Sequence, residues 1–262
     1  MKKLNFIIKY GLALLLLSFY SCESWLNVTP SDRLSEEMLF NDREGFVKAL
    51  NGVYIELNTN ELYGRNLTAG ALDVMGQYYS VASSSHAFYN YGGLVYTGND
   101  EKALFDNMWQ KCYAVIACCN TIIEKCDENK AGLSPVWKGS IKGEALALRA
   151  MLHFDMLRLF GPLTSELDKE SIPYQTNSDQ TVTPLLSGSE VIGLILDDLK
   201  NAVGLLKDTD PYFVEEEFSD TDLNYRRFRM NYFAAKGLMA RVQLWGGDKE
   251  KAAATAKDVI AE

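Results

Sequence analysis

The stretch Gly143–Pro162 reads GEALALRAMLHFDMLRLFGP, and its arrangement of polar and apolar residues indicates a buried helix. At 100° per residue, Glu144 and Asp155 share one narrow stripe. Arg149 and His153, one helical turn apart, point roughly the opposite way. Apolar residues fill nearly all of the remaining circumference. Because a helix that is apolar on most sides is covered on most sides, the stretch predicts a central helix with neighbours on both flanks.

The end of this helix and its two buried polar residues carry further expectations. Gly161-Pro162 should end the helix, with glycine in the left-handed cap position and proline unable to continue the ladder. Arg149 and His153 could hint at catalysis, but the chain supplies no nucleophile elbow or phosphate loop beside them. We therefore interpret the pair as core residues that hydrogen-bond buried carbonyls or carboxylates.

Length and charge limit the class of protein. The chain has 262 residues, 47% of them hydrophobic, which is enough to bury a core without cross-links. Its formal net charge is −9. An acidic protein lacks the basic surface that nucleic acid or anionic lipid requires, so we expect no nucleic-acid partner.

The first residues indicate export. Lys2 and Lys3 precede an apolar run that is too short to span a bilayer, which is typical of a signal peptide over residues 1–21. The run ends in Phe19-Tyr20-Ser21-Cys22, which resembles a bacterial lipobox, although its aromatic residues depart from the usual pattern. We expect Cys22 to be lipidated and residues 22–33 to form an extended tether. The alternative is an ordinary cleaved signal peptide with an incidental cysteine.

The remaining cysteines do not indicate a metal site. Cys112, Cys119 and Cys126 recur every seven residues, so they share one face of a predicted helix about 10 Å apart, too far for a disulfide. No CxxC motif and no histidine accompany them at metal-ligand spacing. We interpret them as small buried hydrophobic residues and expect no metal and no cofactor.

Residues 34–262 should form one mainly α-helical domain. Helix starts are predicted by the capping-box pattern Asn41–Glu44, by Asp100, and by Ser134-Pro135. Residues 163–187 lack periodicity and are expected to be irregular, and 207–222 should be an acidic connector.

The last two predicted helices, about 230–245 and 249–262, form a pair. Small residues, a Gly246-Gly247 turn and an Asp248 cap indicate a tight helical hairpin, which resembles a tetratricopeptide unit. No capping signal follows at Glu262, so the sequence gives the impression of the front part of a longer protein.

Six segments in order are together similar to the SusD/RagB family of outer-membrane nutrient-binding lipoproteins of Bacteroidetes. They are Cys22–Leu26 with Pro30, Ala49–Tyr54, Trp109–Ile123, Gly143–Pro162, Asp198–Leu206 and Ala240–Trp245. The resemblance implies a SusD-like helical scaffold with tetratricopeptide-like pairs and long irregular loops. It also implies a lipid-anchored protein on the outer membrane, facing the cell exterior, that binds a glycan or other nutrient and delivers it to a SusC-like TonB-dependent transporter.

A tyrosine-rich stretch between the first helices is the candidate ligand contact. Residues 78–96 hold five of the chain's 14 tyrosines in a polar, glycine-rich context. Such loops commonly carry binding residues, and aromatic rings can stack on sugar faces. The candidate ligand-binding residues are Tyr78, Tyr79, His86, Phe88, Tyr89 and Tyr91. The alternative is that these rings fold back on the helices or contact the transporter.

Two functions remain open from the sequence. In the first, the protein is a glycan-binding lipoprotein and not an enzyme, since its adjacent carboxylates do not indicate two that face one cleft. In the second, it is a helical-repeat interaction module of the envelope without a small ligand of its own. The tyrosine-rich stretch favours the first.

Overall fold

The computed structural model describes residues 36–179, 181–214 and 218–261, and it confirms the predicted, mainly α-helical class. In this part of the chain the helices are α2 (Glu36–Leu39), α3 (Arg43–Leu57), α4 (Ala71–Met75), α5 (Tyr89–Gly92), α6 (Asn99–Glu128), α7 (Pro135–Phe160), α8 (Gly188–Thr209), α9 (Asp220–Arg226), α10 (Tyr232–Trp245) and α11 (Lys249–Ala261). The strands are β1 (Glu170–Pro173) and β2 (Leu185–Ser187). The expected signal peptide, Cys22 and the expected tether lie outside the described residues.

The chain divides into two compact units, Met1–Leu39 and Phe40–Glu262. The described part of the first unit is the short helix α2, and all other described elements belong to the second. Among the described helices, none combines the length and apolar character needed to cross a membrane.

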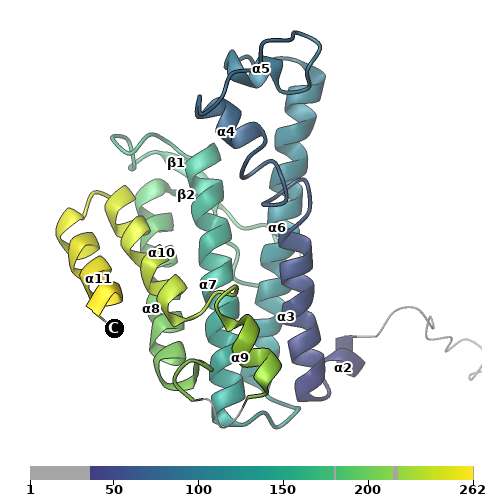
Figure 1. Cartoon of the computed structure of the whole chain (residues 1–262), viewed down its shortest axis with the longest axis vertical. Coiled ribbons are helices and arrows are strands. Elements are labelled where there is room, and N and C mark those ends of the chain that lie inside the picture. The colour runs from purple at the N-terminus through teal and green to yellow at the C-terminus, as the bar shows by residue number, and fades with distance from the viewer. Residues whose placement is uncertain (1–35, 180, 215–217, 262) are drawn as a thin grey trace, which may run out of the picture. The chain divides into compact units, whose positions relative to one another are not determined.

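Helix α7 is the central helix of the second unit, which confirms the prediction from its sequence. In Figure 1, α3 and α6 lie on one side of it, and α8 and α10 on the other. Most of its length is buried, including both the apolar positions and Glu144, Arg149 and His153. Neighbours on both flanks explain why its sequence lacks a solvent-facing stripe.

The two ends of α7 follow different rules. At its start, the Ser134 hydroxyl accepts a hydrogen bond from the Trp137 N–H at 3.3 Å, and Pro135 is the first helical residue, as predicted. At its end, the prediction of a left-handed glycine is wrong: Gly161 is extended, with φ −84° and ψ 178°. The physical reason is Pro162, since a residue before proline is pushed toward the extended region.

Two other predicted helix starts are displaced. Asp42, rather than Asn41, caps α3 by accepting from the Gly45 N–H at 2.8 Å. Helix α6 begins at Asn99, and Asp100 lies in its first turn, where a negative charge favours the helix dipole without forming the cap.

Helix α6 packs against both α3 and α7. Cys112, Cys119 and Cys126 are all buried on one of its faces, which confirms their interpretation as small core residues. Burial raises the pKa of the Cys119 thiol and raises that of Cys126 to about 12, so both remain protonated at neutral pH.

The last pair, α10 and α11, is the predicted tight hairpin. The two helices pack against each other, and Ala235 and Ala252 are buried on them. Gly247 turns the chain with φ +90°, a conformation that favours glycine, and Asp248 caps α11 by accepting from the Lys251 N–H at 3.0 Å.

Two stretches contain structure that the sequence did not indicate. Residues 163–187 are not wholly irregular, because β1 and β2 pair antiparallel within them and bury Ile172. Residues 207–222 are likewise not only a connector. Helix α8 extends to Thr209, and α9 begins after a capping box formed by Ser219 and Asp222. Strand pairing depends on a partner more than ten residues away, so a local periodicity does not report it.

Candidate ligand-binding surface

The tyrosine segment, residues 76–98, connects α4 to α6 and is fixed to them by buried rings. Tyr91 lies on the one-turn helix α5 and forms a small core with Ala71 and Val74 of α4. The Tyr91 ring meets the Phe105 ring of α6 edge to face, with centroids 5.9 Å apart. Phe105 in turn meets Phe160 at the end of α7. The segment is therefore attached to the long helices through a chain of aromatic contacts.

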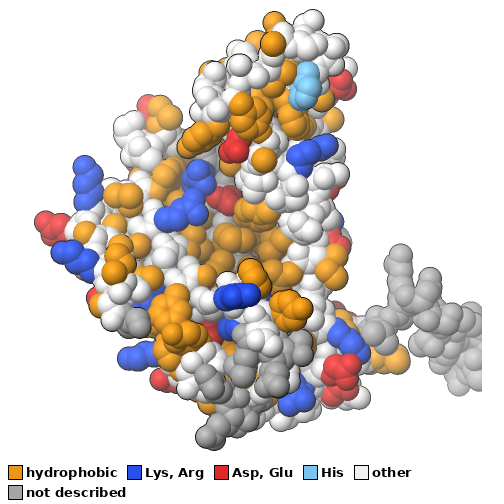
Figure 2. All heavy atoms as spheres, in the orientation of Figure 1, with side chains coloured by type: hydrophobic (Ala, Val, Ile, Leu, Met, Phe, Trp, Pro, Cys, Tyr) orange, Lys and Arg blue, Asp and Glu red, His pale blue; other side chains and the backbone are white. Residues whose placement is uncertain are grey.

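The predicted ligand-contact residues separate into exposed and buried groups. Tyr78 is 81% exposed, Tyr79 43% and Tyr89 42%. His86 is also exposed, while Phe88 is half-buried. These residues remain candidates for direct contact with a ligand, and hydrophobic side chains reach the surface over the α4 and α5 region in Figure 2.

Tyr91 does not belong with them. Its side chain is only 2% exposed, and burial, together with the Glu101 and Asp100 carboxylates, raises the pKa of its phenol to about 12. The expectation that Tyr91 contacts a ligand is therefore not supported, since its ring is part of the core that holds the segment.

Side-chain hydrogen bonds hold the backbone of the tyrosine segment in place. The Gln77 amide donates to the Gly92 carbonyl at 2.9 Å, which joins the two ends of the exposed part. Asn90 donates to the Glu101 carboxylate of α6 at 2.7 Å. Gln77 and Leu94 both have positive φ, 59° and 55°, a conformation that non-glycine residues adopt only where the surroundings enforce it. The exposed tyrosines are thus presented by a fixed backbone.

The six predicted residues are brought together only in part. His86 and Phe88 are neighbours, with ring centroids 5.8 Å apart, and Phe88 also meets Tyr91 at 5.8 Å. No ring contact with another described aromatic residue is formed by Tyr78, Tyr79 or Tyr89. Of these three rings, that of Tyr78 is the most exposed.

The Arg149–His153 pair is structural, as its sequence context indicated. The Arg149 guanidinium donates two hydrogen bonds, both 2.7 Å, to the Asp198 carboxylate of α8, and a third to Asn120 of α6. Tyr174 completes the group by donating to Asp198 at 2.6 Å. These side chains are all buried and mutually hydrogen-bonded.

His153 of α7 binds the backbone of the chain that follows β1. Its Nε2 accepts from the Gln175 N–H at 3.0 Å, so Nδ1 carries the proton and donates to the Arg149 carbonyl at 3.0 Å. Burial, with the nearby Arg149 charge, lowers the pKa of His153 to about 3. An imidazole that is neutral at physiological pH and has both nitrogens hydrogen-bonded is not placed to act as a general base.

A second buried network surrounds Glu144 on the opposite face of α7. Its carboxylate accepts from Tyr54 of α3, from Arg226 of α9 and from Arg229, the last at 2.8 Å. Burial alone would raise the pKa of Glu144, but the two guanidiniums and the Tyr54 hydroxyl outweigh it and lower that pKa below its usual value. Arg226 also forms a bidentate pair with Asp210, at 3.0 and 2.6 Å.

A pocket beside this network was not anticipated from the sequence. It lies between α3, α7 and α9, and Trp137, Asn51 and Tyr225 are among its lining residues. The sequence carries no signal for it, because its walls come from three segments that are more than 60 residues apart. Within the described residues, no group of histidine, cysteine or acidic side chains is arranged to hold a metal ion.

Comparison with known proteins agrees with this architecture. Residues 24–244 match the SusD-like family described as "Starch-binding associating with outer membrane". "SusD-like protein P2" of Formosa agariphila is 26% identical over 265 residues, which cover 98% of this chain and 46% of that protein. A "SusD-like protein" of Bacteroides ovatus is 30% identical over 172 residues, which cover 60% of this chain and 28% of that protein.

Solved structures show the same fold. A SusD-like carbohydrate binding protein from Bacteroides vulgatus matches with a TM-score of 0.67 at 23% identity, over 84% of this chain and 45% of that one. A laminarin-binding SusD-like protein matches with a TM-score of 0.61 at 16% identity, over 84% and 43% of the two chains.

The fold and surface define a helical scaffold protein that presents an aromatic segment at one end of its long helices. The family match covers residues 24–244, which is most of the chain, and the solved structures share the fold. The chain therefore belongs to the SusD-like family. It spans between 28% and 46% of the length of the curated relatives it matches.

Proposed function

We propose that this protein binds a glycan at the outer membrane and delivers it to a transporter. The observation that carries the proposal is the set of exposed tyrosines, Tyr78, Tyr79 and Tyr89, on a backbone fixed by the buried Tyr91. Accessible aromatic faces on a rigid support suit the apolar C–H faces of sugar rings, and the phenol hydroxyls can bond sugar hydroxyls. The family description as starch-binding supports the same class of ligand.

The proposal extends to location and partner. A lipid on Cys22 would anchor the protein in the outer membrane, facing the cell exterior, and a SusC-like TonB-dependent transporter would receive the ligand. The family description as associating with the outer membrane supports this location. The role of the protein is binding and transfer, with no chemical step on the glycan.

Isothermal titration with soluble starch, laminarin and other polysaccharides tests the binding step. The protein carries Cys22→Ser, so that it can be studied without a lipid. The double variant Tyr78→Ala/Tyr89→Ala should weaken binding at least about tenfold, equivalent to about 1.4 kcal/mol, without lowering the melting temperature. The matched control is Tyr212→Ala, since Tyr212 is similarly exposed but lies outside the tyrosine segment.

Two outcomes would count against the proposal. Unchanged affinity in the Tyr78→Ala/Tyr89→Ala variant would remove the tyrosine segment as the binding surface. If the protein bound no polysaccharide but co-purified with an outer-membrane barrel, the envelope interaction module without its own ligand would be the better description.

A further inference from the structure

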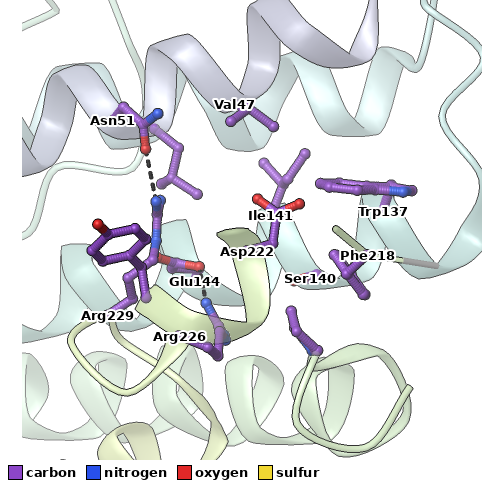
Figure 3. Close-up of a pocket in the computed structure, with 13 residues that line it drawn as sticks. Val47, Asn51, Trp137, Ser140, Ile141, Glu144, Phe218, Asp222, Arg226 and Arg229 are labelled. Atoms are coloured by element: carbon purple, nitrogen blue, oxygen red, sulfur yellow. Dashed lines mark hydrogen bonds and ion pairs between the residues drawn. The ribbon is translucent and has the colours of Figure 1, made fainter. Parts of the chain in front are cut away.

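The pocket between α3, α7 and α9, which we call the α9 pocket, has a volume of about 250 Å³. This is just below the range of about 300–1,000 Å³ for sites that hold drug-sized ligands, so it suits a ligand of roughly one ring. The exposed residues Asn51 and Tyr225 line it, so solvent reaches the interior. Figure 3 shows the labelled side chains converging on this space from the three helices and from the segments before and after α9.

One side of the α9 pocket is aromatic and aliphatic. The Trp137 ring of α7 and the Phe218 ring lie with centroids 4.5 Å apart, and Figure 3 places them together at one end of the space. Arg43 covers the Trp137 ring at 4.7 Å. Val47 of α3 and Ile141 of α7 continue this wall. A ligand here would need an apolar face.

The other side offers both donors and acceptors. Asn51 accepts from Arg229 at 2.7 Å through Oδ1, which leaves its amide N–H groups as donors. Asp222 Oδ2 accepts hydrogen bonds from the N–H and the hydroxyl of Ser219 at the start of α9, which leaves Oδ1 as an acceptor. Figure 3 shows this carboxylate directed into the pocket. The Ser140 hydroxyl also lines the space. Donors and acceptors close to an apolar wall suit a polyhydroxylated ring.

The charges of the pocket favour a neutral ligand. Arg226 and Arg229 are both engaged by the buried Glu144 carboxylate, and Asp210 takes the remaining face of Arg226. An anionic ligand would have to displace Glu144 from this network, and leaving a buried carboxylate without its partners is strongly unfavourable. A neutral ligand leaves every one of these pairs intact.

We propose that the α9 pocket is a second carbohydrate-binding site, which takes a single neutral sugar ring. This inference takes its class of ligand, carbohydrate, from the proposed function, but it concerns a different place on the protein. The tyrosine segment adjoins the start of α6, whereas the α9 pocket adjoins the start of α7, near the other end of α6 (Figure 1). With 30 residues, α6 alone spans about 45 Å, so one sugar ring cannot touch both sites.

Saturation-transfer NMR and calorimetry with monosaccharides test the proposal. The probes are glucose, galactose, mannose and xylose, and the protein is the Cys22→Ser form. Small ligands of this size reach a Kd on the order of 1 mM. Asn51→Ala and Tyr225→Ala should each weaken monosaccharide binding at least about tenfold. Tyr225 is 61% exposed, so Tyr225→Ala should keep the wild-type melting temperature, and Tyr212→Ala serves as the control. Asn51→Ala also removes an acceptor of Arg229, so its melting temperature is measured beside its affinity.

The comparison with the Tyr78→Ala/Tyr89→Ala variant separates this inference from the proposed function. The expected result is that this variant loses polysaccharide binding but keeps monosaccharide binding. If monosaccharide binding were absent, or were lost in this variant and kept in Asn51→Ala, the α9 pocket would not be a sugar site, while the proposed function would stand. If the protein bound neither class of probe, both proposals would fall.

Discussion

At the scale of single residues, Arg149 joins three parts of the chain that are far apart in sequence. Its guanidinium bonds Asp198 of α8, Asn120 of α6 and the Thr176 carbonyl after β1. A buried bidentate pair of this kind contributes little compared with a well-packed apolar pair, but removing one partner leaves an uncompensated charge. Arg149 therefore determines which segments meet more than it adds net stability.

Replacing Arg149 with Ala should lower the free energy of unfolding by about 3–5 kcal/mol, because the buried Asp198 carboxylate loses its partner. Urea denaturation followed by circular dichroism measures this. The double variant Arg149→Met/Asp198→Leu should recover much of the loss. The control Lys48→Ala removes only an exposed ion pair with Glu44 and should leave stability close to unchanged. A single variant as stable as wild type would contradict the assignment.

His153 should make stability depend on pH in a defined window. Its pKa is about 3 in the folded protein and about 6.5 in the unfolded chain. Between these values the unfolded state binds one more proton, so the stabilisation present above pH 6.5 is lost as pH falls toward 3. His153→Gln should remove this contribution, which reduces the slope by up to about 1.4 kcal/mol per pH unit.

The measurement is urea denaturation of wild type and His153→Gln at several pH values between 4 and 7. Comparing the slopes separates His153 from the carboxylates, such as Glu144, that also respond to acid. Equal slopes in wild type and His153→Gln would rule out a buried neutral His153.

At the scale of elements, the contact between α7 and α8 depends on two glycines of α7. A Cβ added to Gly139 would lie 2.6 Å from the Thr209 side chain, and one added to Gly143 would lie 2.8 Å from the Leu206 side chain. Both distances are shorter than atoms tolerate. The two helices can therefore approach this closely only because these positions lack a side chain.

Gly143→Ala should destabilise the protein, although alanine favours a helix by about 1 kcal/mol over glycine. The added methyl group must push Leu206 and the α8 backbone away, which costs about 1–3 kcal/mol in a packed core. The matched control is Gly204→Ala on α8, where an added Cβ meets nothing within 4 Å and should stabilise the protein. Thermal melting of both variants checks the opposite signs, and an increase in melting temperature for Gly143→Ala would contradict the close contact.

At the scale of the whole molecule, the buried networks of α7 and the proposed ligand surfaces are formed by different sets of side chains. The buried Glu144 and Arg149 side chains of α7 each form a hydrogen-bonded network, and these two networks hold neighbouring elements together. The surfaces that we propose for a ligand are the tyrosine segment and the α9 pocket, and one wall of that pocket is formed by Trp137 and Ile141 of α7. The stretch Gly143–Pro162 is thus buried over most of its length, although Arg158 near its end is exposed.

The proposed anchor is a prediction at this same scale. Cys22→Ala should release the protein from the outer-membrane fraction, because acyl chains on Cys22 would hold the protein to the lipid. Cell fractionation followed by immunoblotting measures the distribution. The control Cys118→Ala changes an exposed free cysteine elsewhere and should leave the protein with the membrane. Retention of the Cys22→Ala variant in the membrane would contradict lipidation at this residue.

The sequence by itself determined the helical class, the central position of α7 and the hairpin of α10 and α11. These features depend on periodicity and on capping residues such as Ser134 and Asp248, which act over three or four residues. The motifs along the chain were sufficient to indicate the SusD-like family.

Only the tertiary structure decided which side chains of the candidate site are accessible and what the buried charges bind. Tyr78 and Tyr91 are the same residue type in the same segment. Tyr78 is exposed, whereas Tyr91 lies in a core completed by α4 and α6. Arg226 reaches Glu144 from 82 residues away, and the α9 pocket exists only where these segments meet. Such contacts are set by packing between distant parts of the chain, and a local sequence pattern carries no record of them.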